Sequence, residues 1–230
     1  MEPTILYEDS SLLVVDKPAG LIVHPDEKHN YPALTDWLDK KYPKQGEEES
    51  YFLVHRIDRE TSGVLVVAKT LAACEELKRQ FHDREVQKVY RAFVYGIIKE
   101  ERGVIDKPIG SSREGSGPRT SKNIHGLARE AFTAYRVIER TPDVSYVEIF
   151  PKTGRTHQLR VHFASIQHPI VADRLYAPGR RPLLGFKRLA LHALSLSFVH
   201  PHTKKKLTLT ASLPPDFVQA EQLLEASKSE

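Results

Sequence analysis

Cysteine, methionine and tryptophan each occur only once in this chain of 230 residues. The single cysteine, Cys74, excludes an internal disulfide and the paired-cysteine zinc sites, and its place on the apolar side of a predicted helix indicates a small core residue. No stretch approaches the roughly 18 uninterrupted apolar residues of a membrane span, and the opening residues MEPTILYEDSSLLVV lack a basic leader segment. We therefore expect the reducing cytoplasm as the compartment.

Phosphate-binding fingerprints are missing too, since the chain has neither a GxxxxGKS loop nor a GxGxxG turn, and no nucleotide cofactor is expected. His157 and His162 are five residues apart, a spacing that does not bring two ligands together on a helix or a strand, so no metal site is predicted. Lys plus Arg number 34 against 30 Asp plus Glu, which gives a net charge of +4 and a pI near 9.0. This balance is a hint of a polyanionic partner.

Apolar and β-branched runs predict a protein built mostly from strands. Residues 111–129 have no apolar period and are rich in Ser, Gly and positive charge, so we expect a long mobile loop there. Helices are expected at 33–41, at 70–82, at 156–166 with Thr156 as its cap, and after a capping box of Asp216 and Gln219. Strands are expected at 5–9, 11–18, 51–55, 63–69, 88–96, 103–109, 130–140 and 144–150, with a closing hairpin around 194–198 and 206–210.

Many strands with few helices indicate an α+β fold, with a core of largely antiparallel mixed β-sheet and flanking helices and loops. A chain of this length can bury its core as one domain, or as two sub-lobes that share one active-site cleft.

The densest polar cluster, HRIDRETSG, lies between two apolar strands, where its charges would be costly unless the loop opens into a cleft. Taken alone, an aspartate flanked by Arg56 and Arg59 is more often a solvated ion-pair loop than a nucleophile. Two further polar clusters follow strands, DKPAGLIVHP and PKTGRTHQLRVH, and the second brings Lys152, Arg155 and Arg160. Three such clusters suggest a shared cleft for a polyanion.

From ILYED to ASLPPDF the sequence resembles the RluA family of RNA pseudouridine synthases. HRIDRETSG is similar to the nucleophile loop of that family, DKPAGLIVHP to its opening motif, and QKVYRAFVYG to its tyrosine strand. PKTGRTHQLRVH with HPIVAD is similar to the third motif, and LALHALSLSFVHPHT to the closing hairpin. Ala172 and Gln167 stand where glycines are common. The resemblance implies a single catalytic domain, 1–230, with the pseudouridine synthase fold around a central RNA-binding cleft and without an N-terminal S4 domain.

Carried over by position, the resemblance makes Asp58 the catalytic aspartate, Tyr90 the active-site tyrosine and Arg160 the arginine that pairs with the aspartate. Arg56 would slip into the RNA stack, although a salt bridge to Asp58 or Glu60 is the plainer role. Lys88 either reaches a phosphate or stays solvated. The full set expected to bind substrate is Arg56, His55, Arg59, Thr61, Lys88, Arg155, His157, Gln158 and Lys17.

Further basic residues are candidates for contact with the RNA backbone if they act together, although each alone would be an ordinary solvated charge. They are Arg113, Arg119, Lys122, Arg129 and the run Lys204, Lys205 and Lys206.

The function expected is the isomerisation of uridine to pseudouridine in rRNA or tRNA, within a folded stem-loop, by a monomer that attacks either C1′ or C6 through Asp58. A non-catalytic RNA-binding or ribosome-assembly protein is the alternative, but it would gain nothing from an acid among arginines. A glycoside hydrolase would need two facing carboxylates, and Glu60 is too close along the chain to supply the second.

Overall fold

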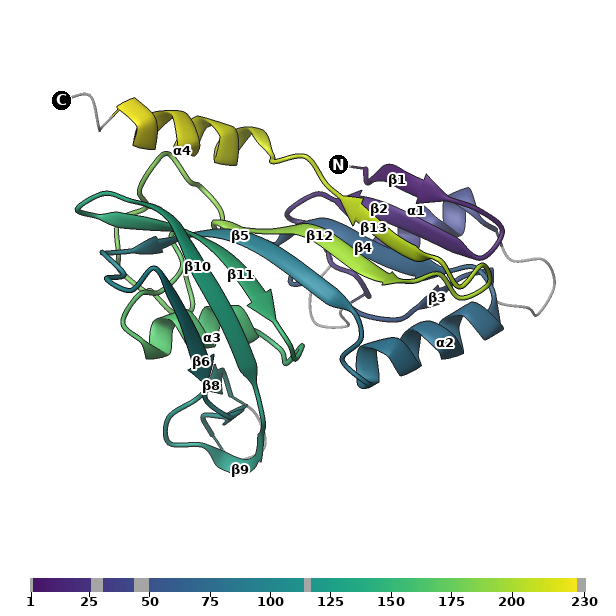
Figure 1. Cartoon of the computed structure of the whole chain (residues 1–230), viewed down its shortest axis with the longest axis horizontal. Coiled ribbons are helices and arrows are strands. Elements are labelled where there is room, and N and C mark those ends of the chain that lie inside the picture. Colours follow the sequence, from purple (N-terminus) through teal and green to yellow (C-terminus); the bar gives the residue numbers. More distant parts are fainter. Residues whose placement is uncertain (1, 26–30, 44–49, 114–116, 227–230) are drawn as a thin grey trace. The chain divides into compact units, whose positions relative to one another are not determined.

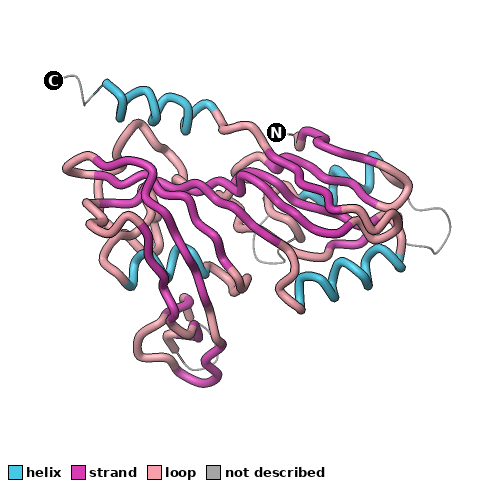
Figure 2. Tube along the Cα trace, in the orientation of Figure 1, coloured by secondary structure: helices cyan, strands magenta, loops and turns pink. Residues whose placement is uncertain are grey.

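The computed structural model describes residues 2–25, 31–43, 50–113 and 117–226. The chain divides into two compact units (Figure 1). Unit 1 comprises Met1–Lys88 and Ala193–Ser212, and unit 2 comprises Val89–His192 and Leu213–Glu230. Strands predominate in both units, and helices flank them (Figure 2). The α+β fold with a strand core is therefore confirmed.

In unit 1 the strands follow the order β1–β2–β4–β12, with β13 paired to β12 and β3 paired to β4. β2 runs antiparallel along one edge of β4, so β3 and β12 share the other edge. The elements are β1 (Thr4–Glu8), β2 (Leu12–Lys17), α1 (Leu34–Lys41), β3 (Phe52–Leu53), β4 (Ser62–Ala68), α2 (Leu71–His82), β12 (Leu191–Val199) and β13 (Lys206–Thr210).

All seven residues of β4 are buried, as expected for a central strand of apolar and β-branched residues covered on both faces. Helix α2, capped by the Thr70 hydroxyl, packs Cys74 and Leu77 onto this strand, and the expected core position of Cys74 is confirmed. The strand expected at 51–55 is wrong in extent, because only Phe52–Leu53 pairs with β4. The rest of that edge is taken by β12, so the chain leaves the sheet early and enters the HRIDRETSG loop.

In unit 2 four antiparallel strands follow the order β5–β11–β10–β6. The register places Tyr90, Ile149 and Tyr135 on one face of this sheet, and Phe163 of α3 packs on Tyr135 of that face. Phe217 of α4 packs against Phe93 on the opposite face. The elements are β5 (Gln87–Tyr95), β6 (Arg102–Asp106), β10 (Phe132–Arg140), β11 (Val144–Pro151), α3 (Gln158–Ser165) and α4 (Pro215–Ala226).

The mobile loop expected at 111–129 is wrong for the residues that the structure describes, although 114–116 lie outside them. A small three-stranded sheet forms here, in the order β8–β7–β9, from β7 (Ile109–Ser111), β8 (Arg119–Thr120) and β9 (His125–Arg129). Every residue of β9 is exposed, and β8 has only two residues. Such strands show no apolar alternation, which explains why their sequence does not predict them.

Two predicted helix starts also differ. Thr156 does not cap α3, whose N-cap is His157 in the left-handed region at φ 57°. The Gln158 side chain folds back instead, and its oxygen accepts hydrogen bonds from the preceding loop. Asp216 lies inside the first turn of α4, which begins at Pro215, and its carboxylate binds Arg188 at 2.7 and 2.8 Å. Proline suits this first position because it has no N–H to satisfy.

Candidate active site

The HRIDRETSG loop follows β3 and runs into β4, whose first two residues are its Ser62 and Gly63, and residues 55–61 form neither helix nor strand. Arg56 is exposed, Ile57 is buried, and the Asp58 side chain lies at an intermediate depth. The Asp58 carbonyl accepts the Thr61 N–H at 3.1 Å, which closes a tight turn over residues 58–61. The loop is thus locally folded, with a solvent-facing arginine and a half-buried acid.

Lys17, at the end of β2, is hydrogen-bonded to the backbone of this loop. Its side chain is fully buried, and its ammonium donates to the carbonyls of Pro18 at 2.9 Å, Leu21 at 2.8 Å and Arg59 at 3.2 Å. The Arg59 carbonyl also accepts the Gly20 N–H at 2.7 Å. An ammonium has three protons to donate, and these three carbonyls accept from it. This geometry makes Lys17 an anchor of the HRIDRETSG loop, and the expectation that it binds substrate stays a prediction.

His55 and Thr61 flank the loop from within unit 1. The Nε2 atom of His55 accepts the Val66 N–H at 3.0 Å, and its ring stacks on Phe81 with 4.6 Å between centroids. Burial, and to a lesser extent the Lys88 ammonium, lowers the pKa of His55 to about 3, so the ring is neutral. Thr61 is buried, and its hydroxyl has no hydrogen-bond partner among the described residues. The expectation that these two side chains bind substrate stays a prediction.

Arg59 and Lys88 are half-buried. The Arg59 guanidinium lies 4.0 Å from the ring centroid of Tyr31 and 3.5 Å from a Glu60 oxygen. Lys88 is two residues before Tyr90 on β5 and therefore points to the same side of the strand.

In unit 2, Tyr90 is half-buried on the sheet face that α3 covers, opposite Ile149 in the register. Arg160 lies in the first turn of α3. Its Nε and Nη2 atoms donate to the two carboxylate oxygens of Asp173, at 2.8 and 2.9 Å. Asp173 ends the HPIVAD motif and is fully buried, yet sequence reasoning did not assign it a role. The available signal in the sequence was an aspartate at the end of the third motif, which also carries Arg160.

The remaining candidates of the third motif divide between interior and surface. Gln158 is buried, and its amide oxygen accepts from Thr153 and the Arg155 N–H while its NH₂ donates to Phe132 and Thr133. All four hydrogen-bonding positions of this amide are occupied, and the expectation that Gln158 binds substrate stays a prediction. His157 forms a hydrogen bond to the Tyr176 hydroxyl at 3.0 Å.

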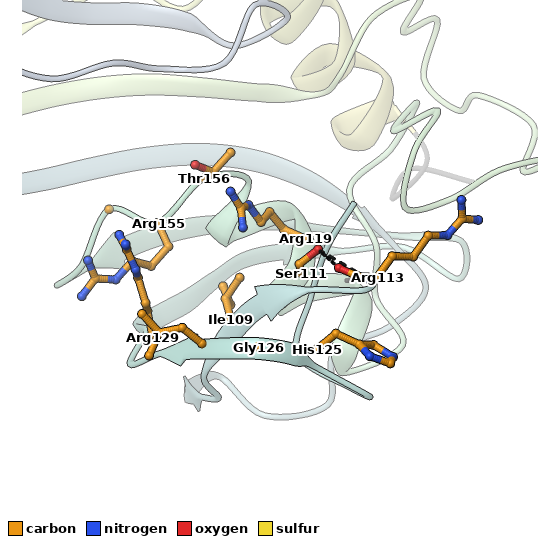
Figure 3. A pocket seen from close by; sticks show the side chains of 11 residues that line it. Ile109, Ser111, Arg113, Arg119, His125, Gly126, Arg129, Arg155 and Thr156 are labelled. Carbon is orange, nitrogen blue, oxygen red and sulfur yellow. Dashed lines mark hydrogen bonds between the residues drawn. The ribbon is translucent and has the colours of Figure 1, made fainter. Parts of the chain in front are cut away.

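A basic pocket of about 600 Å³ opens beside the small three-stranded sheet (Figure 3). Four arginine side chains line it, three from the small sheet and its loops and one, Arg155, from the segment after β11. Arg155 is held there by a bond from its Nε to the Glu130 carbonyl at 3.0 Å. The lining residues are Ile109, Ser111, Arg113, Arg119, His125, Gly126, Leu127, Arg129, Gly154, Arg155 and Thr156.

Several guanidinium groups around one cavity suit a polyanion such as the phosphate backbone of RNA. The structure thus brings together three of the basic loop candidates with Arg155. Lys122 is exposed and does not line the pocket, and Lys204–Lys206 belong to unit 1.

Asp58 belongs to unit 1, whereas Tyr90 and Arg160 belong to unit 2. Their meeting in one cleft therefore stays a prediction. Within the described ranges, no group of three or more His, Cys, Asp or Glu residues is arranged to hold a metal ion. No helix in the described part of the chain has both the length and the apolar character to cross a membrane.

Comparison with solved structures identifies the fold as that of a pseudouridine synthase domain. The chain matches the structure titled Human RNA Pseudouridylate Synthase Domain Containing 4 with a TM-score of 0.78 and 29% identity, covering 96% of this chain and 93% of the human one. A second human structure, RNA Pseudouridylate Synthase Domain Containing 1, matches with a TM-score of 0.77 and 29% identity over 100% of this chain and 96% of that one.

Sequence comparison agrees. Residues 11–165 match the RNA pseudouridylate synthase family model. Ribosomal large subunit pseudouridine synthase D of Pasteurella multocida (strain Pm70) is 35% identical over 96% of this chain and 71% of its own length. An uncharacterized RNA pseudouridine synthase of Bacillus subtilis (strain 168) is 38% identical over 95% of this chain and 72% of its own length. The chain belongs to the RluA family of RNA pseudouridine synthases, and it is an isomerase that acts on RNA.

Proposed function

We propose that this enzyme isomerises a uridine of ribosomal RNA, within a folded stem-loop, with Asp58 as the nucleophile. The match over residues 11–165 carries the proposal, because Asp58, Tyr90 and Arg160 all lie within it. Relatives named as ribosomal large subunit pseudouridine synthase D, from Pasteurella multocida and from Pseudomonas aeruginosa at 38% identity, support large-subunit RNA as the substrate. A tRNA stem-loop is the second substrate to test, and we propose a cytoplasmic monomer.

The reaction breaks the N-glycosidic bond, turns the uracil so that C5 faces C1′, joins those atoms, releases the C5 proton and places a proton on N1. Ionised Asp58 attacks either C1′ or C6 and leaves again at the end, so no atoms are gained or lost. The half-buried setting of its carboxylate, on a loop fastened through Lys17 and Gly20, supports this role because a nucleophile must be held before it attacks.

The uridine must first leave the base stack, which costs a few kcal/mol. Arg56 is the exposed arginine of the loop, and a planar cation there can fill the vacated space and contact phosphate. Tyr90 offers a ring on which the uracil can stack and a hydroxyl that can relay the C5 proton. Arg160 is proposed to pair with the Asp58 carboxylate and to orient it.

The basic pocket of unit 2 supports a second part of the proposal, contact with the RNA backbone away from the reacting base. Phosphate contacts position a nucleic acid without reading its sequence, and four guanidinium groups provide them. Arg155 contributes to substrate binding here, as a contact to the RNA backbone.

The non-catalytic RNA-binding alternative is not favoured, because the relatives are named as synthases. One experiment separates the two. Purified protein is incubated with unmodified large-subunit rRNA and with tRNA, and pseudouridine is mapped by carbodiimide-dependent stops of reverse transcription. We expect one or a few new stops with wild-type protein.

Asp58→Asn should retain RNA binding and form no product, because an amide cannot act as the nucleophile. Asp143→Asn is the matched control, since Asp143 is exposed in the turn before β11 and undergoes the same chemical change. Substantial product from Asp58→Asn would refute the proposal, and a wild-type protein that binds RNA without producing stops would favour the binding alternative.

A further inference from the structure

The guanidinium of Arg160 is held on one defined edge. Nε and Nη2 each donate to a different oxygen of Asp173, a bidentate geometry in which a rotation of the guanidinium would break both bonds. The Arg160 side chain is 11% exposed and the Asp173 side chain 0%. Two charges removed from water in this way demand close pairing, since either one left alone would be costly.

Asp173 is itself fixed by its own turn. Its Oδ1 atom accepts the backbone N–H groups of Leu175 at 2.9 Å and Tyr176 at 3.0 Å, and its carbonyl accepts the Ala177 N–H at 2.9 Å. The carboxylate is therefore attached to the backbone of residues 173–177 and cannot follow a moving arginine.

The same turn supplies a second contact to Arg160. The ring of Tyr176 lies beneath the guanidinium, with 5.1 Å between its centroid and the Cζ atom. The Tyr176 hydroxyl bonds to Nδ1 of His157 at 3.0 Å, and His157 is the N-cap of the helix that carries Arg160. The turn thus contacts the Arg160 guanidinium on one edge through Asp173 and on one face through Tyr176. Through His157 it is also bonded to the start of α3.

We propose that Asp173 is a positioning residue of the reaction, which sets the orientation of Arg160, with Tyr176 and His157 supporting it. The inference rests on the proposed function, in which Arg160 acts on Asp58. A guanidinium can present two edges to carboxylates, and Asp173 takes the Nε–Nη2 edge. The proposed pairing with Asp58 then falls to the Nη1 side.

Asp173→Asn tests this with little change to the turn. The asparagine oxygen can still accept the Leu175 and Tyr176 N–H groups, but its NH₂ replaces the oxygen that faces Nε of Arg160, so that one donor meets another. We expect the single-turnover rate at saturating RNA to fall about 100-fold, the scale of a displacement of about 1 Å, with RNA affinity almost unchanged.

The chain offers a matched control in the pair of Arg188 and Asp216. Arg188 donates from Nε and Nη2 at 2.7 and 2.8 Å, and Asp216 also accepts a backbone N–H, that of Phe217. Asp216→Asn therefore breaks the same kind of pair in the same unit, away from the residues proposed for the chemistry. It should lower the melting temperature without a comparable loss of rate.

A double-mutant cycle separates positioning from plain structural support. In an Arg160→Lys background the guanidinium is absent, so adding Asp173→Asn should lower the single-turnover rate only slightly further. Equal rate losses in both backgrounds, or a rate for Asp173→Asn like that of Asp216→Asn, would overturn the inference. An Arg160→Lys enzyme with full activity would instead overturn the proposed role of Arg160. If Asp173→Asn does not fold, Tyr176→Leu is the alternative test. A folded Tyr176→Leu variant with an undiminished single-turnover rate would contradict the proposal that this turn positions Arg160.

Discussion

Lys17→Met is the sharpest test of the loop anchor, because methionine nearly matches the length of lysine and removes only the ammonium. The carbonyls of Pro18 and Leu21 then lose a charged donor, while the Arg59 carbonyl keeps the Gly20 N–H. Each buried group that loses its partner costs about 1–3 kcal/mol, so two cost about 2–6 kcal/mol. Relief from burying an ammonium offsets part of this. We therefore expect a net loss of about 3 kcal/mol, which corresponds to a melting temperature lower by about 6–12 °C for a chain of this size.

Thermal unfolding followed by circular dichroism, with urea midpoints as a second measure, gives the free energy of unfolding of each variant. Lys69→Met is the control, since its ammonium bonds to Glu8 and the Asp9 carbonyl but the side chain is 21% exposed. Such a partly exposed pair contributes about 1 kcal/mol or less. A melting temperature for Lys17→Met within about 2 °C of the wild type would show that the three bonds do not hold the loop.

Two further predictions concern RNA and pH. Changing Arg119 and Arg129 together to Gln removes two phosphate contacts and should make the slope of log affinity against log salt concentration shallower by about 1.4–1.8, whereas changing the exposed Arg102 to Gln should leave the slope unchanged. Filter binding at salt concentrations from about 50 to about 200 mM measures the slope. An unaltered slope in the double variant would show that the pocket does not bind RNA. The lowered pKa of His55, about 3 against 6.5 in the unfolded chain, means that unfolding takes up a proton between these values, so stability falls as pH drops through this window. His55→Gln, whose oxygen can still accept the Val66 N–H, should flatten that fall in urea midpoints measured from neutral to acidic pH, and an identical acid response would contradict the assignment.

The regular elements were predictable wherever burial leaves a periodic pattern. The seven residues of β4 and the apolar face of α2 are covered by the core, so the apolar side chains appear at the spacing of a strand or a helix. Hairpin β12–β13 was predictable for the same reason. The small sheet β7–β9 could not be found in this way, because its longest strand is exposed at every residue and its order comes from backbone pairing.

Asp58, Tyr90 and Arg160 were assigned from the sequence alone, because the motifs around them are long and follow one another in a fixed order. What surrounds those residues was not. Lys17 and Gln158 are expected from the sequence to bind substrate, and the structure shows that both are buried, with backbone carbonyls, N–H groups and hydroxyls among their partners. A sequence shows that a side chain can donate or accept a hydrogen bond, but not which distant atom it meets.

The sequence by itself determined the strand-rich fold, the family and the identity of the proposed nucleophile, since these depend on local periodicity and on motifs read in order. Only the tertiary structure decided that Asp173 forms an ion pair with Arg160 and that four arginines line one pocket. Such arrangements join residues that are far apart in the chain, and their geometry depends on how strands and turns pack, which no local pattern records.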